Sequence, residues 1–320
     1  MRFATTTHDE LYTLLEETSR TFALAIPLLP EPLCTEVTEA YLLFRIADTF
    51  EDATRWPVPD RIAALDELAR ILEESDGSRR VGALARRWRD REPIAHAGYL
   101  RLLEEAPLVF QALWDTDNRA AAIIVSHTVR TCRGMACFLR RAGEDGILRL
   151  HTLDELRAYC YTVAGIVGEM LTELILLECD DEGLAPRLRT RARRFGEALQ
   201  LVNVLRDSRT DVREGRALVP DSVSRDALFR LARADLREAA EYTLALQDAS
   251  AARGIVAFNA LPVLLAMATL DRVEEAGPGS KIVRARVWAI MAKLKADIRL
   301  GRPVIRLKRE APAPPAPSPA

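Results

Sequence analysis

Cysteine and histidine are scarce in this sequence, and their spacing argues against the common disulfide and zinc frameworks. The five cysteines are scattered, form no C-x-x-C pair and are odd in number, which favours a reducing cytosol. The four histidines lie far apart, and none stands in the H-E-x-x-H spacing of a zinc enzyme. We therefore expect free thiols, no zinc site and a cytoplasmic protein.

The sequence also lacks an excess of charge and a long hydrophobic run. Its 45 Lys and Arg against 47 Asp and Glu give a formal net charge of −2, so the total predicts no nucleic-acid partner. The N-terminus, MRFATTTHDELYTLLEE, carries charge where a signal peptide needs an apolar stretch. The longest apolar run, 255–270, is shorter than the ~20 residues of a membrane span and contains Asn259 and Pro262. We expect a soluble protein or a peripheral one.

Alternating β-branched runs are absent, and the helical period is present almost throughout. Apolar residues recur at three- and four-residue intervals, as in Leu65, Leu68, Ile71 and Leu72. Turn signals divide the chain into nine or ten expected helices with short loops, and no internal linker separates domains. The pattern predicts one all-α domain over residues 1–303. Residues 304–320 end in APAPPAPSPA and predict a disordered tail rich in proline and alanine.

The stretch YLLFRIADTFED at residues 41–52 places acidic side chains on an otherwise apolar helix. Asp48 and Asp52 stand four residues apart, so a helix carries both carboxylates on one side, about 6 Å apart along its axis. Glu51 and Arg45 lie three residues to either side of Asp48, on adjoining parts of that face. A helix that is apolar nearly all round is normally buried, so these charges are expected to line a cavity. An isolated Asp-x-x-x-Asp pair, by contrast, is more often a solvated helix face with salt bridges.

A second acidic cluster repeats this spacing over two helical turns. Asn203, Asp207 and Asp211 follow one another at intervals of four, and Arg206 and Arg216 stand close by. Carboxylates one turn apart repel each other unless a cation neutralises them, and Mg²⁺ is commonly held by carboxylates together with substrate phosphates. Two such clusters therefore favour two facing walls that hold a diphosphate through Mg²⁺. The apolar surroundings predict that the substrate has a greasy tail.

Four segments in order along the chain resemble the head-to-head prenyl synthase family, which contains the squalene and phytoene synthases. Residues 41–52 are similar to the family's first Asp-rich motif, and residues 200–220 to its second. Ser19-Arg20-Thr21-Phe22 is similar to the Ser-Arg-Ser-Phe flap. Residues 159–168, YCYTVAGIVG, are similar to the Tyr/Ala-Gly helix. A chance occurrence of all four in this order is very improbable.

The resemblance implies an isoprenoid-synthase helical bundle with a central cavity, and a Mg²⁺-dependent prenyltransferase. In this family one prenyl diphosphate ionises, and the cation attacks the double bond of a second to give a cyclopropyl diphosphate. By this resemblance the catalytic residues are Tyr159, a phenol near the departing group, and Asp48, Asp52, Asp207 and Asp211. The expected Mg²⁺ ligands are Asp48, Glu51, Asp52, Asn203, Asp207 and Asp211. The expected substrate-binding residues are Ser19, Arg20, Thr21, Phe22, Tyr41, Arg45, Gly165, Arg206 and Arg216.

Details of the motifs lie nearer to squalene synthases than to phytoene synthases. The first motif reads Asp-Thr-x-Glu-Asp, where phytoene synthases usually read Asp-Asp-x-x-Asp. The stretch FNALPVLLAMATL and the later VRAR resemble squalene synthase segments, of which the second is associated with NADPH. The resemblance therefore implies NADPH as a cofactor, with Arg20, Arg45, Asn203, Phe258, Arg284 and Arg286 as the residues that bind it. Three positions depart from the usual pattern: Thr21 replaces a serine, Val263 a glutamine and Arg284 a lysine.

The leading hypothesis is a squalene synthase-type enzyme that condenses two farnesyl diphosphates through presqualene diphosphate, with reduction by NADPH. A dehydrosqualene or phytoene synthase, which needs no reductant, is the enzymatic alternative. A non-catalytic helical scaffold homologue is the alternative of another class, but such a protein would be expected to have lost acidic ligands, and both clusters are intact. We also expect that the protein contacts a membrane peripherally when it releases its product.

Overall fold

Apolar residues at helical spacing form the helices of the N-terminal half. In α4, for example, Ala64, Leu65, Leu68, Ile71 and Leu72 are all buried. The structure, a computed structural model, describes residues 7–74, 78–179 and 181–307. The elements of this half are α1 (Thr7–Thr18), α2 (Phe22–Ala25), η1 (Ile26–Leu28), α3 (Leu33–Glu51), α4 (Val58–Glu73), α5 (Ser78–Asp90), α6 (Ala97–Glu104), α7 (Ala106–Asp115) and α8 (Asn118–Leu139).

The C-terminal half is also helical, with two strands of two residues each. Its elements are β1 (Leu148–Arg149), α9 (Leu153–Cys160), η2 (Tyr161–Gly165), α10 (Ile166–Leu177), α11 (Leu184–Arg213), β2 (Arg216–Ala217), α12 (Arg225–Asp248), α13 (Arg253–Ala276) and α14 (Arg284–Arg299). The prediction of an all-α fold is confirmed. The helices outnumber the nine or ten expected because some breaks are very short: only Glu105 separates α6 from α7, where a proline opens the new helix.

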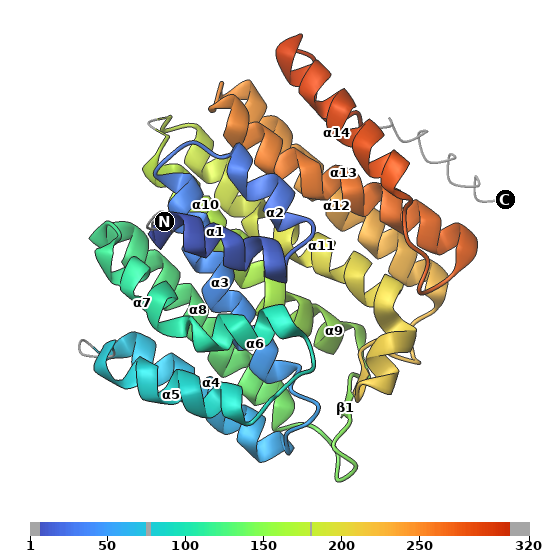
Figure 1. Cartoon of the computed structure of the whole chain (residues 1–320). Coiled ribbons are helices and arrows are strands. Elements are labelled where there is room, and N and C mark those ends of the chain that lie inside the picture. The colour runs from blue at the N-terminus through green and yellow to red at the C-terminus, as the bar shows by residue number, and fades with distance from the viewer. Residues whose placement is uncertain (1–6, 75–77, 180, 308–320) are drawn as a thin grey trace, which may run out of the picture.

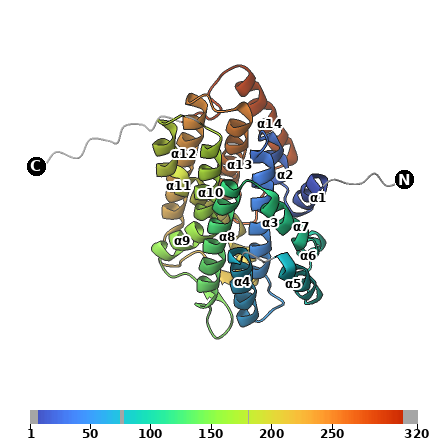
Figure 2. The ribbon, with the colours of Figure 1, turned by 90° about the vertical axis from the view of Figure 1, so that its left-hand side faces the viewer.

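The helices are arranged around α3, α8, α10 and α11. Figure 2 shows α11 and α12 on one side of the molecule, α1, α6 and α7 on the opposite side, and α3 and α8 between them. The helix α11 contacts α10, α12 and α13. Two glycines let α10, η2 and α11 approach closely, because a Cβ on Gly168 would lie 2.1 Å from the Ala192 oxygen and one on Gly196 would lie 1.9 Å from the Ala164 oxygen.

A π-helical turn interrupts the helix that leads to this contact. The element η2, Tyr161–Gly165, is π-helical and joins α9 to α10 without a loop. By length and composition alone, Leu153–Leu177 and Arg253–Ala276 could cross a membrane, but 56% and 67% of their apolar windows is buried inside the fold. The apolar run 255–270, expected to be too short for a span, is thus part of a 24-residue helix. Most of its residues pack into the core.

The C-terminal end of the core extends beyond the expected boundary at residue 303. Val304 and Ile305 are each 2% exposed and belong to the hydrophobic core, and the Val304 amide donates to the Gln247 side-chain oxygen over 3.0 Å. The packed domain therefore includes these residues, because the chain folds back along α12 after α14. The expected Pro/Ala-rich tail from residue 308 onward lies outside the described residues and stays a prediction.

Candidate active site

The C-terminal end of α3 and one face of α11 line a single polar pocket. Asp48 and Glu51 lie in the last turn of α3, and Asp52 caps that helix. Asn203, Asp207 and Asp211 come from α11. The pocket has a volume of about 160 Å³. It is lined by Asp48, Glu51, Asp52, Tyr159, Val163, Gln200, Asn203, Val204, Asp207, Asp211, Arg216 and Leu218.

Arg216 joins the two acidic clusters. Gly215 has a φ of +82°, which is readily adopted only by glycine, and it turns the chain back after α11. The parallel pairing of Arg216 with Leu148 then fixes the backbone of Arg216. Its guanidinium forms ion pairs with Asp52 of α3 and, at 3.2 Å, with Asp211 of α11. One arginine therefore holds together two carboxylates that are far apart in the sequence.

Burial raises the pKa values of several carboxyl groups that line this pocket. Burial raises the pKa of Glu51 from its ordinary 4.5 to about 7, and the neighbouring Asp52 and Asp48 add to this rise. Burial also raises the pKa of Asp48 from 3.8 to about 6, against the attraction of Arg45. The pKa of Asp211 is raised by burial and lowered less strongly by Arg216. The pocket therefore crowds five carboxyl groups around one arginine, and a further cation bound there would favour their ionised forms.

This surplus of oxygen donors fits Mg²⁺, which prefers carboxylate and amide oxygens. Within the described residues, no group of three or more His, Cys, Asp or Glu side chains already stands in position to hold a metal. The carboxylates are instead paired with arginines: Asp48 with Arg45 at 3.2 Å, and Asp207 with Arg206 at 2.8 Å. Binding of a metal would therefore require these side chains to exchange their arginine partners for the ion.

Tyr159 and Glu51 form a buried hydrogen-bonded pair at the edge of the pocket. The Tyr159 hydroxyl donates to Glu51 Oε1 over 3.0 Å, and the two residues are 3% and 5% exposed. Burial, and then the Glu51 charge, raises the pKa of Tyr159 well above its ordinary value of 10.0. The phenol ring packs edge-on against Phe138 at 5.3 Å. The tyrosine is therefore a neutral donor, and Glu51 is the group of the pair that can change its protonation near neutral pH.

An apolar pocket of about 210 Å³ adjoins the polar one. The two share Asp48, Val163, Gln200 and Asn203 as lining residues. The apolar pocket is further lined by Phe22, Ile26, Val37, Tyr41, Phe44, Arg45, Ala164, Val167, Gly168, Met170, Leu171, Phe195, Gly196, Leu199, Phe258 and Pro262. A ligand that fills both pockets must have a polar end and an apolar end.

Tyr41 and Arg45 stand where the two pockets meet. The Arg45 guanidinium lies over the rings of Tyr41 and Tyr99, 5.4 and 5.3 Å from their centroids. Arg45 Nε donates to the Tyr41 hydroxyl over 3.2 Å, and that hydroxyl donates to the Thr18 carbonyl over 3.0 Å. Phe22 packs on Tyr41 at 5.6 Å. These contacts attach the segment before α2 to the wall of the cavity.

Some residues expected at the site line neither pocket. Ser19 accepts a hydrogen bond from the Phe22 amide, Thr21 precedes α2, and Arg20 is exposed. Gly165 faces its own helix and α11, since an added Cβ would lie 2.7 Å from Tyr161 Cδ2. Arg206 lies beside the polar pocket, bonded to Asp207. Arg284 and Arg286 are exposed at the start of α14.

Arg61 is a site neighbour that the sequence motifs did not reveal. It comes from α4, is 7% exposed, and donates to the backbone carbonyl of Glu51. Its Nε has no hydrogen-bond partner in the described parts of the chain. Burial lowers the pKa of Arg61, while Glu51 and Asp52 raise it. The sequence does hold one indication of its burial: Arg61 stands three residues before Ala64, on the apolar stripe of α4.

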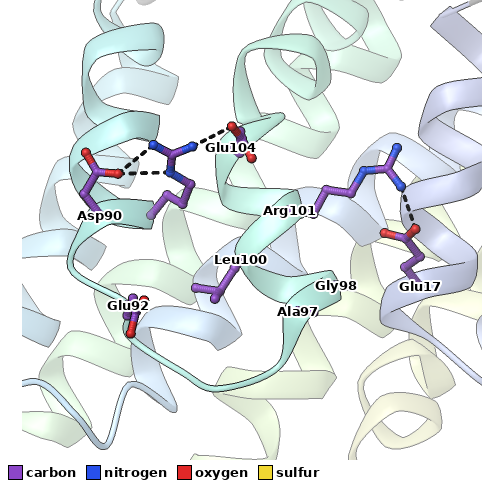
Figure 3. A pocket seen from close by; sticks show the side chains of 9 residues that line it. Glu17, Asp90, Glu92, Ala97, Gly98, Leu100, Arg101 and Glu104 are labelled. Carbon is purple, nitrogen blue, oxygen red and sulfur yellow. Dashed lines mark hydrogen bonds and ion pairs between the residues drawn. The ribbon is translucent and has the colours of Figure 1, made fainter.

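A larger hollow of about 820 Å³ lies elsewhere, between α1, α5 and α6. Its two arginines already have carboxylate partners, as Figure 3 shows for Arg101 and Glu17. Arg89 contacts Asp90 at 2.7 Å and Glu104 at 2.6 Å, and Arg101 contacts Glu17 at 2.5 Å. All these side chains are substantially exposed, and exposed ion pairs of this kind contribute little. The pair of pockets between α3 and α11 is therefore the candidate active site.

Comparisons with known proteins agree with this assignment. The family model described as Squalene/phytoene synthase matches residues 15–227. A squalene synthase of Gibberella zeae is 30% identical over 219 residues, which is 67% of this chain and 44% of that protein. The Botryococcus squalene synthase of Botryococcus braunii is 29% identical over 204 residues, which is 63% of this chain and 40% of that protein. The chain thus spans less than half the length of these curated relatives.

Solved structures show the same fold. The complex of TcSQS with the ligand E5700 superposes with a TM-score of 0.73 at 23% identity, covering 93% of this chain and 89% of that one. A dehydrosqualene synthase in complex with a ligand superposes with a TM-score of 0.55 at 16% identity, covering 92% and 97% of the two chains. At these identities the likeness concerns the fold alone.

Proposed function

Because the chain belongs to the squalene/phytoene synthase family, a family of prenyltransferases, we propose that it joins two farnesyl diphosphates head to head through presqualene diphosphate. We further propose that NADPH reduces this intermediate to squalene. The observation that carries the proposal is the direct junction of an acidic pocket with an apolar one, which share four lining residues. A prenyl diphosphate has the same division into a charged head and a hydrocarbon tail.

The acidic pocket would bind the diphosphate end of the substrate. Asp48, Glu51, Asp52, Asn203, Asp207 and Asp211 would hold Mg²⁺, which neutralises the diphosphate as it departs. Once these carboxylates have turned to the ion, Arg45, Arg206 and Arg216 are free to bind diphosphate oxygens in a bidentate manner. The arginines that pair with the carboxylates in the free protein would thus become substrate ligands.

The apolar pocket would protect the carbocation. Loss of diphosphate leaves a positive charge on C1 of one prenyl chain, and the double bond of the second chain attacks that carbon. Apolar side chains such as Phe44 and Leu171 keep water away, and the face of an aromatic ring stabilises a cation. Closing the cyclopropane ring releases a proton. The departed diphosphate, held in the adjoining polar pocket, is a base that can receive this proton, and the Tyr159 hydroxyl, which lines that pocket, can relay it.

The reductive step would draw on residues around the apolar pocket and on α14. NADPH would supply the hydride when bound. Phe258, Arg45 and Asn203 line the pocket, while Arg20, Arg284 and Arg286 are exposed. Arg284 and Arg286 form no ion pair within the described chain and stand at a helix N-terminus, where backbone amides favour anions. Their chemistry therefore fits the phosphates of a dinucleotide.

The experiment is to incubate the purified protein with farnesyl diphosphate and Mg²⁺, with and without NADPH, and to identify the lipids. We expect squalene only when NADPH is present, and presqualene diphosphate to accumulate without it. The same desaturated hydrocarbon in both reactions would show a dehydrosqualene synthase instead. If the protein consumes geranylgeranyl diphosphate but not farnesyl diphosphate, and the product is phytoene, the enzyme is a phytoene synthase.

Matched variants separate loss of chemistry from loss of fold. Asp48→Asn removes one charge from the polar pocket. Glu39→Gln removes one from the same helix, at a buried position that lines neither pocket. We expect the first to lose turnover and the second to keep it. Equal turnover in the two variants would contradict the assignment of the site.

A further inference from the structure

The helix α14 presents an unusual surface to solvent. It packs against α13 through one side, where Leu294 and Asp297 are buried. At 100° per residue, Ala285, Ala289, Ala292 and Ala296 fall on the opposite side and form a continuous stripe, and all four are exposed. Trp288 borders this stripe and is 62% exposed, whereas Trp114 elsewhere in the fold is 38% exposed. Figure 1 shows α14 along the outer edge of the molecule beside α13.

Apolar side chains also mark both ends of the helix. Val283, just before it, is 68% exposed, and Leu300, just after it, is 60% exposed. Together with Trp288 these are three of the large apolar side chains most open to solvent in the described structure. We call Val283, Trp288, Leu300 and the alanine stripe the α14 face. A helix with a buried apolar side normally turns polar residues outward, so this second apolar side needs a separate explanation.

The charges that flank the α14 face are almost all positive. Residues 281–306 contain eight lysines and arginines and a single carboxylate, Asp297, although the whole chain has a formal net charge of −2. Asp297 is buried and already paired with Lys293. Lys295 and Arg299 flank the stripe on the Trp288 side, are exposed and form no ion pair in the described parts of the chain. The outer surface of α14 is therefore cationic as well as apolar.

These observations indicate which partner fits. We propose that the α14 face docks the enzyme on the surface of a membrane that contains anionic phospholipid. An apolar stripe bordered by tryptophan and by long basic side chains matches the boundary between acyl chains and negatively charged headgroups. A second copy of the same face is a poorer partner, because a two-fold contact would place like charges opposite each other.

The position of α14 relative to the candidate active site gives this docking a consequence. The loop between α13 and α14 touches the second acidic helix, since the Gly279 amide donates to the Arg206 carbonyl over 2.7 Å. Arg206 is next to Asp207 of the polar pocket. On the other side, α14 packs on α13, whose Phe258 and Pro262 line the apolar pocket. Docking through α14 would therefore leave a single helix, α13, between the lipid surface and the apolar pocket.

Sedimentation with lipid vesicles tests the proposal directly. The full chain is mixed with vesicles of phosphatidylcholine alone, or of phosphatidylcholine with 30% phosphatidylglycerol, at low and at high salt. We expect binding only to the anionic vesicles, with a loss at high salt because screening weakens the attraction. In Lys295→Gln/Arg299→Gln, the partition coefficient should fall by about 30-fold, from the contribution typical of two basic residues near such a surface. Trp288→Ala should weaken binding as well.

The matched control removes two exposed arginines far from α14. Arg70→Gln/Arg86→Gln changes net charge equally, at positions on α4 and α5, and should bind vesicles as the unaltered protein does. Thermal unfolding verifies that all variants fold. The proposal fails if the protein does not bind anionic vesicles, or if both double variants lose binding to the same extent. It also fails if sedimentation shows a dimer that dissociates only in the Lys295→Gln/Arg299→Gln variant. None of these outcomes depends on the reaction the enzyme catalyses.

Discussion

Replacing Glu51 by glutamine should stabilise the metal-free protein at alkaline pH while impairing catalysis. Glutamine has nearly the same shape, and its carbonyl oxygen can still accept the hydrogen bond from Tyr159, which spans 3.0 Å to Glu51 Oε1. The substitution therefore removes the ionisable group and leaves the packing unchanged. Its effect on stability should come from the charge of Glu51 alone.

The magnitude follows from the raised pKa. Burial raises the pKa of Glu51 from 4.5 to about 7, so the folded protein binds this proton more tightly than the unfolded chain. The stability it contributes is complete below pH 4.5 and is lost as the pH rises through 7. One pKa unit corresponds to about 1.4 kcal/mol, so ionisation of Glu51 lowers the free energy of unfolding by roughly 3 kcal/mol at pH 8. At pH 5 the cost is about 1 kcal/mol, because the proton is then mostly retained.

Urea unfolding at pH 5 and pH 8, in a chelator, measures this difference. We expect the free energy of unfolding of Glu51→Gln to exceed that of the unaltered protein by roughly 3 kcal/mol at pH 8 and by about 1 kcal/mol at pH 5. Added Mg²⁺ should stabilise the unaltered protein more at pH 8 than at pH 6, since metal and proton compete for the same carboxylates. In Glu51→Gln the stabilisation by Mg²⁺ should be smaller than in the unaltered protein.

Glu39 provides the matched control. It is 2% exposed on the same helix, and burial raises its pKa to about 7, although a hydrogen bond from Thr116 opposes this. Glu39→Gln should show the same stabilisation at pH 8, but with an unchanged response to Mg²⁺ and unchanged turnover. If Glu51→Gln is no more stable than the unaltered protein at pH 8 without metal, the reasoning about the charged pocket is wrong.

Three further outcomes are expected. Asp48→Asn and Asp207→Asn should each lower turnover by about 10²–10³-fold with an unchanged circular dichroism spectrum; full activity in both would refute the metal assignment. Tyr159→Phe should keep the stability given by ring packing but slow turnover by about 10²–10⁴-fold, and an unaffected rate would remove the phenol from the mechanism. Gly196→Ala should lower the free energy of unfolding by about 1–3 kcal/mol, because its Cβ would lie 1.9 Å from the Ala164 oxygen; unchanged urea unfolding would contradict the close packing.

The acidic clusters were predictable from the sequence because each is local. Asp48 and Asp52 on α3, or Asp207 and Asp211 on α11, are four residues apart, and helical geometry alone places each pair on one face. The likeness of the four motifs to one family then related the clusters to each other. In the structure both clusters line one polar pocket.

The remaining features depend on contacts between distant segments, which spacing does not reveal. Arg216 reaches Asp52 across 164 residues of sequence, and only the turn at Gly215 and the pairing with β1 direct it there. Arg61 reaches the end of α3 from a different helix, in a segment without a motif. Conversely, Gly165 belongs to a glycine-rich motif, yet it lies at a helix contact, because an added Cβ would be 2.7 Å from Tyr161 Cδ2 and 3.4 Å from Glu197 Cγ.

That π-helical turn limits how the protein can be altered. A residue added to an α-helix rotates everything on one side of it by about 100° relative to the other side. Tyr159 precedes the turn, whereas Val163 and Ala164 lie within it, and all three line the joined pockets. Deleting one residue of Tyr161–Gly165 would give a more regular helix and swing the Tyr159 hydroxyl away from Glu51. A design that favours regular helices would therefore move the phenol out of the cavity even if it kept every side chain that lines the two pockets.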